Sequence, residues 1–295
     1  MVDFLIGVDG GGTATRAWLA RRDGPVIGRG QAGPSALGQG IDAAWAQIEL
    51  AVRGAFQAAA LPVPPWNRCA LGAGLSGVSN RPWRDAFLAR NIGFAKLIAE
   101  TDSFTMLLGA HRGRPGAIVA AGTGSVGEVL RADGSRFTAG GWGFPVGDEG
   151  SGAWLGLHAV RVAQCAIDGR IQPGPLARRV FAVCGADRDS VQAWCDLAGQ
   201  YAYAQLAPAV FDTEQTDSSA VHLLGHAVAA LETVAVAIDP PGELPLAVCG
   251  SVGRRLAPRM SPAIRRRLVD AAEGPAGGAL TLVRQAVEEE EAVRA

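Results

Sequence analysis

The chain has 295 residues, of which 48% are hydrophobic and 19% are charged, a balance typical of globular proteins with a large buried core. This composition excludes a disordered chain, a collagen-like chain and a coiled coil, and the length favours about two domains. The 27 basic and 28 acidic residues leave a net charge of −1. A protein that binds nucleic acid through its phosphates carries a basic excess, so we expect no nucleic-acid partner.

Cysteine usage and the apolar segments indicate a reducing, aqueous compartment. The five cysteines are an odd number and form no C-x-x-C pair, which indicates neither a disulfide framework nor a zinc ribbon. The first residues lack the basic segment and the cleavage pattern of a signal peptide. The longest apolar stretch, at 221–238, is interrupted by two histidines and a glutamate, which favours a buried helix over a membrane span. We therefore expect a cytoplasmic protein without membrane contact.

The first half of the chain alternates strand and helix patterns. An apolar run from Phe4 to Val8 ends at Asp9, three glycines follow, and residues 15–21 alternate polar and apolar with a period of two. Strand, glycine turn and strand predict a β-hairpin. The alternation of strands and helices beyond it predicts a mostly parallel α/β layer. The further expected elements are strands at 26–30, 69–75 and 95–100, and helices at 41–60, 82–91 and 103–112.

The second half begins with a similar pattern. The buried strand at 117–121 leads into a Gly-Thr-Gly-Ser turn and then a strand pair around Asp133-Gly134, which favours a duplicated layout. We place the domain boundary at the glycine- and proline-containing segment Gly113–Gly116, which gives domains at 1–115 and 116–295. Beyond residue 152 the pattern is mainly helical up to a strand at 244–249. The last helix, about 277–293, is expected to pack back on the first domain as one alternative.

Asp9 and the loop Gly10–Thr13 form the first candidate site. Consecutive glycines at a tight turn expose backbone N–H groups that can point at an anion. Asp9 at the strand end is suited to hydrated Mg²⁺, which takes only one or two carboxylates. A hairpin turn with an aspartate cap explains the same residues without a ligand.

The turn Gly122–Ser125 is the second candidate. Together with Gly127 it matches the G-x-G-x-x-G dinucleotide fingerprint, but that fingerprint opens a helix, and here a strand follows. A second phosphate-facing turn that mirrors the first fits this context better. No P-loop sequence is present.

Asp102 is the third candidate, because it is a carboxylate between a predicted strand and a predicted helix. It would act as a general base facing the cleft between two domains. The alternative is a structural one, in which Asp102 or Ser103 is the N-cap of the helix.

The segment 140–152 is the fourth candidate, with six glycines in thirteen residues around Trp142. An aromatic plate with nearby carboxylates suits a polyhydroxylated ligand, whose hydroxyls would donate to Asp148 or Glu149. Alternatively, the two carboxylates only precede the helix that begins near Ser151 and favour its dipole.

Taken in order, these motifs resemble the N-acetylglucosamine kinase family, in particular its bacterial branch. That branch includes glucosamine kinases and belongs to the BadF/BadG/BcrA/BcrD ATPase grouping. The motifs are Asp9-Gly-Gly-Gly-Thr13, Thr101-Asp102, Gly122-Thr-Gly-Ser125, Gly141-Trp-Gly with Gly-Asp-Glu-Gly-Ser151, and Cys249-Gly-Ser251. The resemblance implies an α/β fold of two actin-like (ribonuclease H-like) domains with the active site in the interdomain cleft.

The resemblance also implies roles for individual residues. Asp102 corresponds to the catalytic aspartate that takes the proton from the sugar 6-hydroxyl, and Asp9 to the residue that helps to hold Mg²⁺. The implied substrates are ATP and an amino sugar, N-acetylglucosamine or glucosamine. The residues expected at ATP are Gly10, Gly11, Gly12, Thr13, Gly122, Thr123, Gly124, Gly250 and Ser251. Those expected at the sugar are Leu37, Ser125, Gly141, Trp142, Gly143 and Asp148.

Two departures from the family pattern bear on the sugar. Many members have asparagine in place of Leu37, and some have it in place of Val126, so two amides are missing from the expected sugar pocket. The choice between N-acetylated and free amino sugar stays open. Two other functions of the same fold also stay open: an activator ATPase, and a sugar sensor without turnover. The sequence assigns no oligomeric state, and a homodimer is kept as one alternative.

Overall fold

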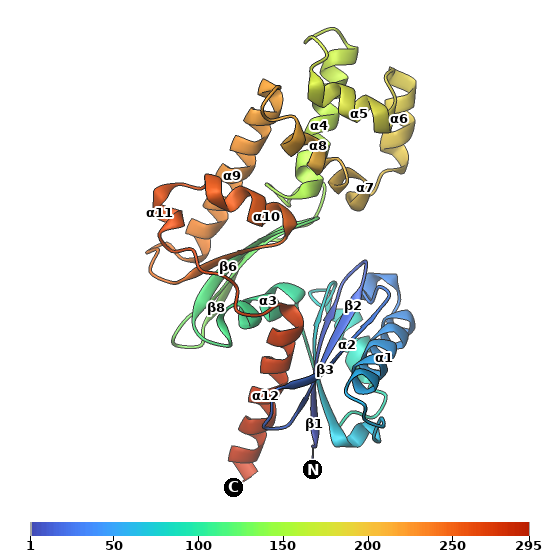
Figure 1. Ribbon diagram of the computed structural model, residues 1–295, viewed down its shortest axis with the longest axis vertical. Helices are drawn as coiled ribbons and strands as arrows, with labels where there is room; N and C mark the ends of the chain where they lie inside the picture. Colours follow the sequence, from blue (N-terminus) through green and yellow to red (C-terminus); the bar gives the residue numbers. More distant parts are fainter. Residues whose placement is uncertain (1, 295) are drawn as a thin grey trace. The chain divides into compact units, whose positions relative to one another are not determined.

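The computed structural model describes residues 2–294 and divides into two compact α/β units. One unit runs to Gly116 and takes in Ala132–Gly134 and the residues from Asp270 onward. The other consists of Ala117–Arg131 and Ser135–Val269. Each unit contains one β-sheet with helices against it (Figure 1). The last helix of the chain therefore belongs to the unit that contains the first strand.

The first sheet has five strands in the order β3-β2-β1-β4-β5. β1, β2 and β3 are antiparallel neighbours, whereas β4 and β5 continue parallel to β1. The predicted hairpin and parallel layer are confirmed, and the elements begin and end within about two residues of their expected bounds. The strands are β1 (Phe4–Gly10), β2 (Thr15–Arg21), β3 (Val26–Ala32), β4 (Cys69–Leu75) and β5 (Lys96–Glu100).

Both faces of this sheet are covered, which explains the continuous apolar run of β1. Ile6 and Val8 point to one face and share a core with α1, while Leu5 points to the other face and packs with α12. Figure 1 shows α1 and α12 on opposite sides of the strands. The helical segments of this unit are η1 (Leu37–Gln39), α1 (Ile41–Ala58), η2 (Trp66–Arg68), α2 (Arg81–Ala89), α3 (Asp102–His111) and α12 (Pro275–Arg294).

The second sheet repeats the order of the first four strands, as β8-β7-β6-β9. Its strands are β6 (Gly116–Ala121), β7 (Ser125–Leu130), β8 (Arg136–Gly140) and β9 (Leu246–Cys249). Between β8 and β9 lies a long helical segment, which makes most of this unit's core. Its helices are α4 (Gly152–Ile167), α5 (Pro175–Cys184), α6 (Arg188–Leu197), α7 (Gln200–Ala204), α8 (Ala207–Asp212) and α9 (Ser218–Ile238); α10 (Ser251–Leu256), η3 (Ala257–Arg259) and α11 (Pro262–Arg265) follow β9.

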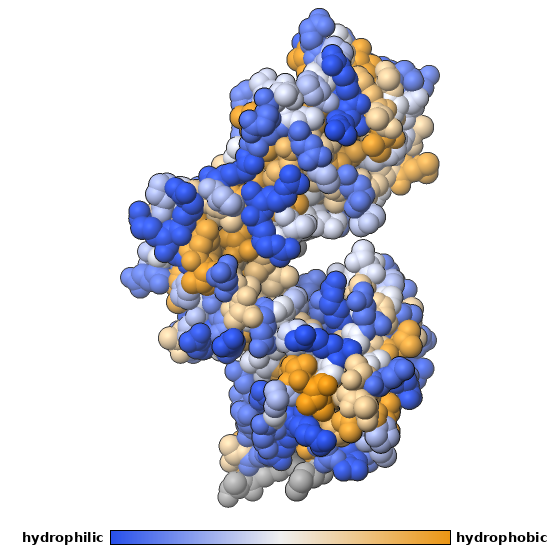
Figure 2. Space-filling model, viewed as in Figure 1, coloured by the Kyte–Doolittle hydropathy of each residue, from blue (hydrophilic) through white to orange (hydrophobic). Residues whose placement is uncertain are grey.

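The apolar stretch at 221–238 forms most of α9. The helix is long and apolar enough to cross a membrane by length and composition, a test that core helices of soluble proteins also pass. Leu224 and Leu231 are buried in the core of the second unit, as the interruption by polar residues indicates. On the face drawn in Figure 2, hydrophilic residues are widespread and apolar residues gather in small patches.

The crossing of α12 over α3 depends on glycine. A Cβ atom built on Gly278 would lie 1.7 Å from the carbonyl oxygen of Thr105 and 2.5 Å from the amide nitrogen of Gly109. Such distances are far inside van der Waals contact, so no larger residue fits without separating the two backbones. Because α3 begins at Asp102, this crossing helps to fix the position of a candidate site residue.

We expect Gly278→Ala to lower the free energy of unfolding by about 1–3 kcal/mol, because overpacking outweighs the better helix propensity of alanine. The matched control is Gly225→Ala in α9, where a Cβ meets no atom within 4 Å. That variant should be neutral or more stable by up to about 1 kcal/mol. Denaturant unfolding of both variants is the measurement, and equal stabilities would contradict the tight crossing.

Candidate functional site

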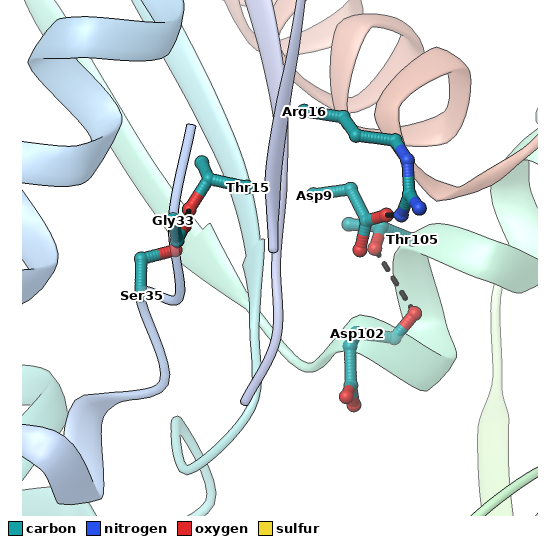
Figure 3. Close-up of polar contacts among 7 residues, drawn as sticks. All are labelled: Asp9, Thr15, Arg16, Gly33, Ser35, Asp102 and Thr105. Carbon is teal, nitrogen blue, oxygen red and sulfur yellow. Dashed lines mark hydrogen bonds and ion pairs between the residues drawn. The ribbon is translucent and has the colours of Figure 1, made fainter. Parts of the chain in front are cut away.

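Asp9 lies near the end of β1, directly opposite Arg16 of β2 in the antiparallel register. A guanidinium nitrogen of Arg16 lies 3.2 Å from Oδ2 of Asp9, and the Asp9 side chain is 16% exposed. Burial raises the pKa of Asp9, Arg16 opposes this shift, and the charge of Asp102 adds to it. The exposed guanidinium of Arg16 therefore stabilises the negative charge of the partly buried Asp9 carboxylate (Figure 3). No sequence motif points to Arg16, although its register with Asp9 follows from the hairpin.

Asp102 occupies the first turn of α3 and is not its N-cap. The cap is Thr101, whose hydroxyl accepts a hydrogen bond from the amide of Phe104 at 3.1 Å. This corrects the structural alternative that gave the cap to Asp102 or Ser103, since threonine is itself a favourable cap. The Asp102 carboxylate accepts the Ser103 amide at 2.9 Å, and no ion pair to it occurs within residues 2–294. Burial raises its pKa, against the opposing effect of that amide.

The loop after β1 has unused amide donors. Its base is held by the hydroxyl of Thr15, which donates to the carbonyl of Gly33 at 2.6 Å and shares a second hydrogen bond with the hydroxyl of Ser35 at 2.7 Å (Figure 3). Among the hydrogen bonds of the described residues, the N–H groups of Gly12 and Thr13 have no acceptor. Backbone amides without an acceptor in a glycine turn are suited to an anion such as a phosphate group.

The turn between β6 and β7 has the same property. The amides of Thr123 and Gly124 likewise have no acceptor in the described part of the chain, whereas Gly122 donates to the carbonyl of Gly124 at 2.9 Å. Ser125 is buried, and its hydroxyl donates to the carbonyl of Glu149 at 2.8 Å. The turn is thus tied to the glycine-rich segment 140–151, which we call the Gly-Trp loop.

Asp148 joins this turn to a helix far along the chain. Its backbone has a φ of +64°, and only 4% of the residue is exposed. Oδ1 accepts the amide of Ser125 at 3.1 Å, and Oδ2 accepts the side-chain amide of Gln200 at 2.7 Å. Burial raises the pKa of Asp148, the Ser125 amide lowers it, and the charge of Glu149 raises it. No local sequence pattern points to Gln200, which lies in the helical segment.

The remaining residues expected at the sugar or at ATP differ in their exposure to solvent. Trp142 is 86% exposed, between Gly141 and Gly143, which both have left-handed backbones. Leu37 is 1% exposed and packs in the core of the first unit. Ser251 is exposed at the start of α10, after Gly250 with a φ of +83°. Asp9, Asp102 and the first glycine loop thus share one unit, whereas Asp148, Trp142 and the second turn share the other.

Gly124→Ala tests the contact between the turn and Asp148. A Cβ at residue 124 would lie 2.9 Å from both carboxylate oxygens of Asp148, so the substitution should displace them and lower the free energy of unfolding by about 1–3 kcal/mol. Gly122→Ala is the matched control, because its Cβ meets nothing within 4 Å. If denaturant titration shows the same change for both variants, the carboxylate is not held as described.

Comparison with known proteins extends over most of the chain. A model of the BadF/BadG/BcrA/BcrD ATPase family matches residues 6–240. Glucosamine kinase GspK of Vibrio cholerae is 31% identical over 278 residues, which cover 92% of this chain and 94% of that protein. These matches confirm the resemblance that the ordered motifs indicate.

Solved structures agree with this assignment. A Chromobacterium violaceum protein, provisionally named an N-acetylglucosamine kinase, is 46% identical with a TM-score of 0.92, covering 96% of this chain and 99% of that one. A ROK family glucokinase from Streptomyces griseus is 19% identical with a TM-score of 0.54, covering 96% and 99%. The second likeness shows the fold alone and confirms the expected two-domain, actin-like α/β architecture. The chain belongs to the BadF/BadG/BcrA/BcrD ATPase family.

Proposed function

We propose that this protein is an amino-sugar kinase, which transfers the γ-phosphoryl group of ATP to the 6-hydroxyl of glucosamine or N-acetylglucosamine. The observation that carries the proposal is the Asp102 carboxylate, which is half-buried at the start of α3 and accepts a hydrogen bond from a backbone amide without a paired cation in the described residues. A carboxylate used only for structure would be expected to cap the helix, and Thr101 already does so. The names of the two similar kinases support an amino sugar as the acceptor.

Asp102 serves as the general base in this reaction. Its carboxylate accepts the proton of the sugar hydroxyl while that oxygen forms a bond to the γ-phosphorus and the bond from phosphorus to the leaving oxygen of ADP breaks. The products are ADP and the sugar 6-phosphate, and the proton passes from Asp102 to solvent. A pKa raised by burial makes Asp102 a stronger base than an exposed aspartate.

The two glycine turns would bind the phosphates of ATP. Each offers two free amides, those of Gly12 and Thr13 in one loop and those of Thr123 and Gly124 in the other. Phosphoryl transfer depends mainly on positioning and on stabilising charge at the phosphate oxygens, which fixed backbone donors supply. Gly250 and Ser251 would lie near the adenosine, as the family resemblance implies.

Asp9 would hold Mg²⁺. Residues 2–294 contain no group of three or more His, Cys, Asp or Glu that could bind a metal ion. Mg²⁺ is commonly bound by one or two carboxylates, water and substrate phosphates, so a lone carboxylate beside a phosphate loop fits it. The ion would neutralise charge on the phosphates. Arg16 opposes the rise in the pKa of Asp9 that burial causes, and so favours the charged carboxylate that a metal ion needs.

The Gly-Trp loop would bind the sugar. The exposed ring of Trp142 can pack on an apolar sugar face. Each Asp148 oxygen accepts one hydrogen bond and retains a lone pair for a sugar hydroxyl. Leu37 stands where many family members have an amide, and its side chain is buried in the core of the first unit, so it offers no hydrogen bond to a sugar N-acetyl group.

The activity test is ADP release with MgATP and each of glucosamine, N-acetylglucosamine, glucose and N-acetylmannosamine. Turnover should require an amino sugar, and Asp102→Asn should lower kcat by about 10²–10⁴-fold because it removes the base. Asp85→Asn, at an exposed helix carboxylate, should leave kcat unchanged. ADP release independent of sugar would favour the activator ATPase, and sugar binding without turnover would favour the sensor.

Asp102→Asn should also raise stability at neutral and alkaline pH. Burial holds the folded-state pKa of Asp102 above the ordinary value of an aspartate, so the folded state binds the proton more tightly than the unfolded state. The free-energy cost of keeping the charged carboxylate in the folded state is complete above the folded-state pKa of Asp102. It vanishes below the pKa of the unfolded state. Denaturant unfolding over this range should show the variant's advantage shrinking as pH falls, and a constant difference would contradict burial as the cause.

A further inference from the structure

A short helix in the inserted segment packs unusually closely on the helix that follows the Gly-Trp loop. α7 contacts α4, and a Cβ built on Gly156 of α4 would lie only 1.8 Å from the carbonyl oxygen of Tyr203. The glycine therefore lets the backbone of α7 rest on α4 at one fixed place. α4 begins at Gly152, immediately after the loop, so α7 lies beside the loop as well.

α7 touches the loop with two side chains. The side-chain amide of Gln200 donates to Oδ2 of Asp148 at 2.7 Å. The ring of Tyr203 lies against the ring of Phe144, with centroids 5.1 Å apart. The first contact is polar and the second apolar, and both come from one turn of one helix.

Asp148 depends on the Gln200 contact for its orientation. The residue is 4% exposed, and its backbone is in the left-handed region, which aspartate tolerates better than most residues other than glycine. The Ser125 amide satisfies only Oδ1. Without Gln200, Oδ2 would keep the desolvation cost of a buried charged oxygen and lose its donor. The carboxylate would then turn toward water or take up a proton.

The orientation of Asp148 affects the rest of the loop. Its carbonyl accepts the amide of Ser151 at 3.0 Å, and Ser151 in turn caps α4 by accepting the amide of Trp154 at 3.2 Å. Asp148 therefore connects the Ser125 turn, the Gly-Trp loop and the start of α4. A change at Gln200 therefore acts on the Gly-Trp loop through Asp148.

We infer that Gln200 is a positioning residue for the sugar: it holds Asp148 as an oriented hydrogen-bond acceptor and thereby sets the affinity for the acceptor hydroxyls. This inference rests on the proposed kinase function and deepens it, because it assigns control of sugar binding to the inserted helices. Gln200 contacts the Gly-Trp loop and not Asp102, so we expect its substitution to change the KM for the sugar.

The test compares three variants at residue 200 with the wild type. Gln200→Met keeps the length without a donor, Gln200→Glu places a second negative charge against Asp148, and Gln200→His restores a donor at similar reach. Losing a hydrogen bond to a charged group corresponds to about a tenfold to hundredfold rise in sugar KM. We expect that rise for Met, a larger one for Glu and partial rescue by His, with an unchanged KM for ATP.

Gln192→Met, at an exposed position of α6, is the control for a glutamine substitution in the same segment and should match the wild type. An unchanged sugar KM in Gln200→Met, with the wild type active, would overturn the inference and leave the proposed function intact. Equal losses in the Met and His variants, or a parallel rise in the KM for ATP, would indicate a packing role and also overturn it. A wild type without sugar-dependent turnover would overturn both proposals.

Discussion

The close contact between the backbones of α3 and α12 determines where the candidate base lies. α12 is the last helix of the chain, yet it packs on the first strand and across α3, where Gly278 leaves no space for a side chain. α3 in turn presents Asp102 from its first turn. The end of the sequence therefore supports the start of the site, and a small increase in volume at the crossing would move the helix that holds the carboxylate.

Such rigid support matters because three of the candidate residues, in the two units, are acids that are partly or fully buried. Burial raises the pKa of Asp9, Asp102 and Asp148, because removing a charged carboxylate from water costs free energy. The compensation differs at each position: a cation for Asp9, one backbone amide for Asp102, and two donors for Asp148. Asp102 is the least compensated, which suits the proposed role of a proton acceptor, since a stronger partner would lower its basicity.

Local patterns predicted much of this structure, and long-range contacts explain what they missed. The hairpin, the glycine turns and the helix from 41 onward follow from periodicity and turn residues that act over a few positions. Thr101 was overlooked as a cap because three consecutive residues can each fill that role. Gln200 could not be predicted, since it is 52 residues from Asp148 and meets it only because α7 packs on α4. Leu37 was expected at the sugar, and its burial reflects a tertiary core that a motif does not encode.

The two sheets share their strand order, so the difference between the units lies mainly in what is inserted. In the first unit the candidate base follows a sheet strand directly and is fixed by helices on that sheet. In the second unit the Gly-Trp loop is held by α7, part of a helical segment between β8 and β9. Strands buried on both sides tolerate few changes, whereas Gln200 is half-buried, so its contact with Asp148 can change while the buried Tyr203 stays in place. Under the proposed function, differences in sugar preference among related chains should therefore accumulate at inserted positions such as Gln200 that face the Gly-Trp loop, while the candidate phosphate turns and the candidate base stay fixed by the sheets.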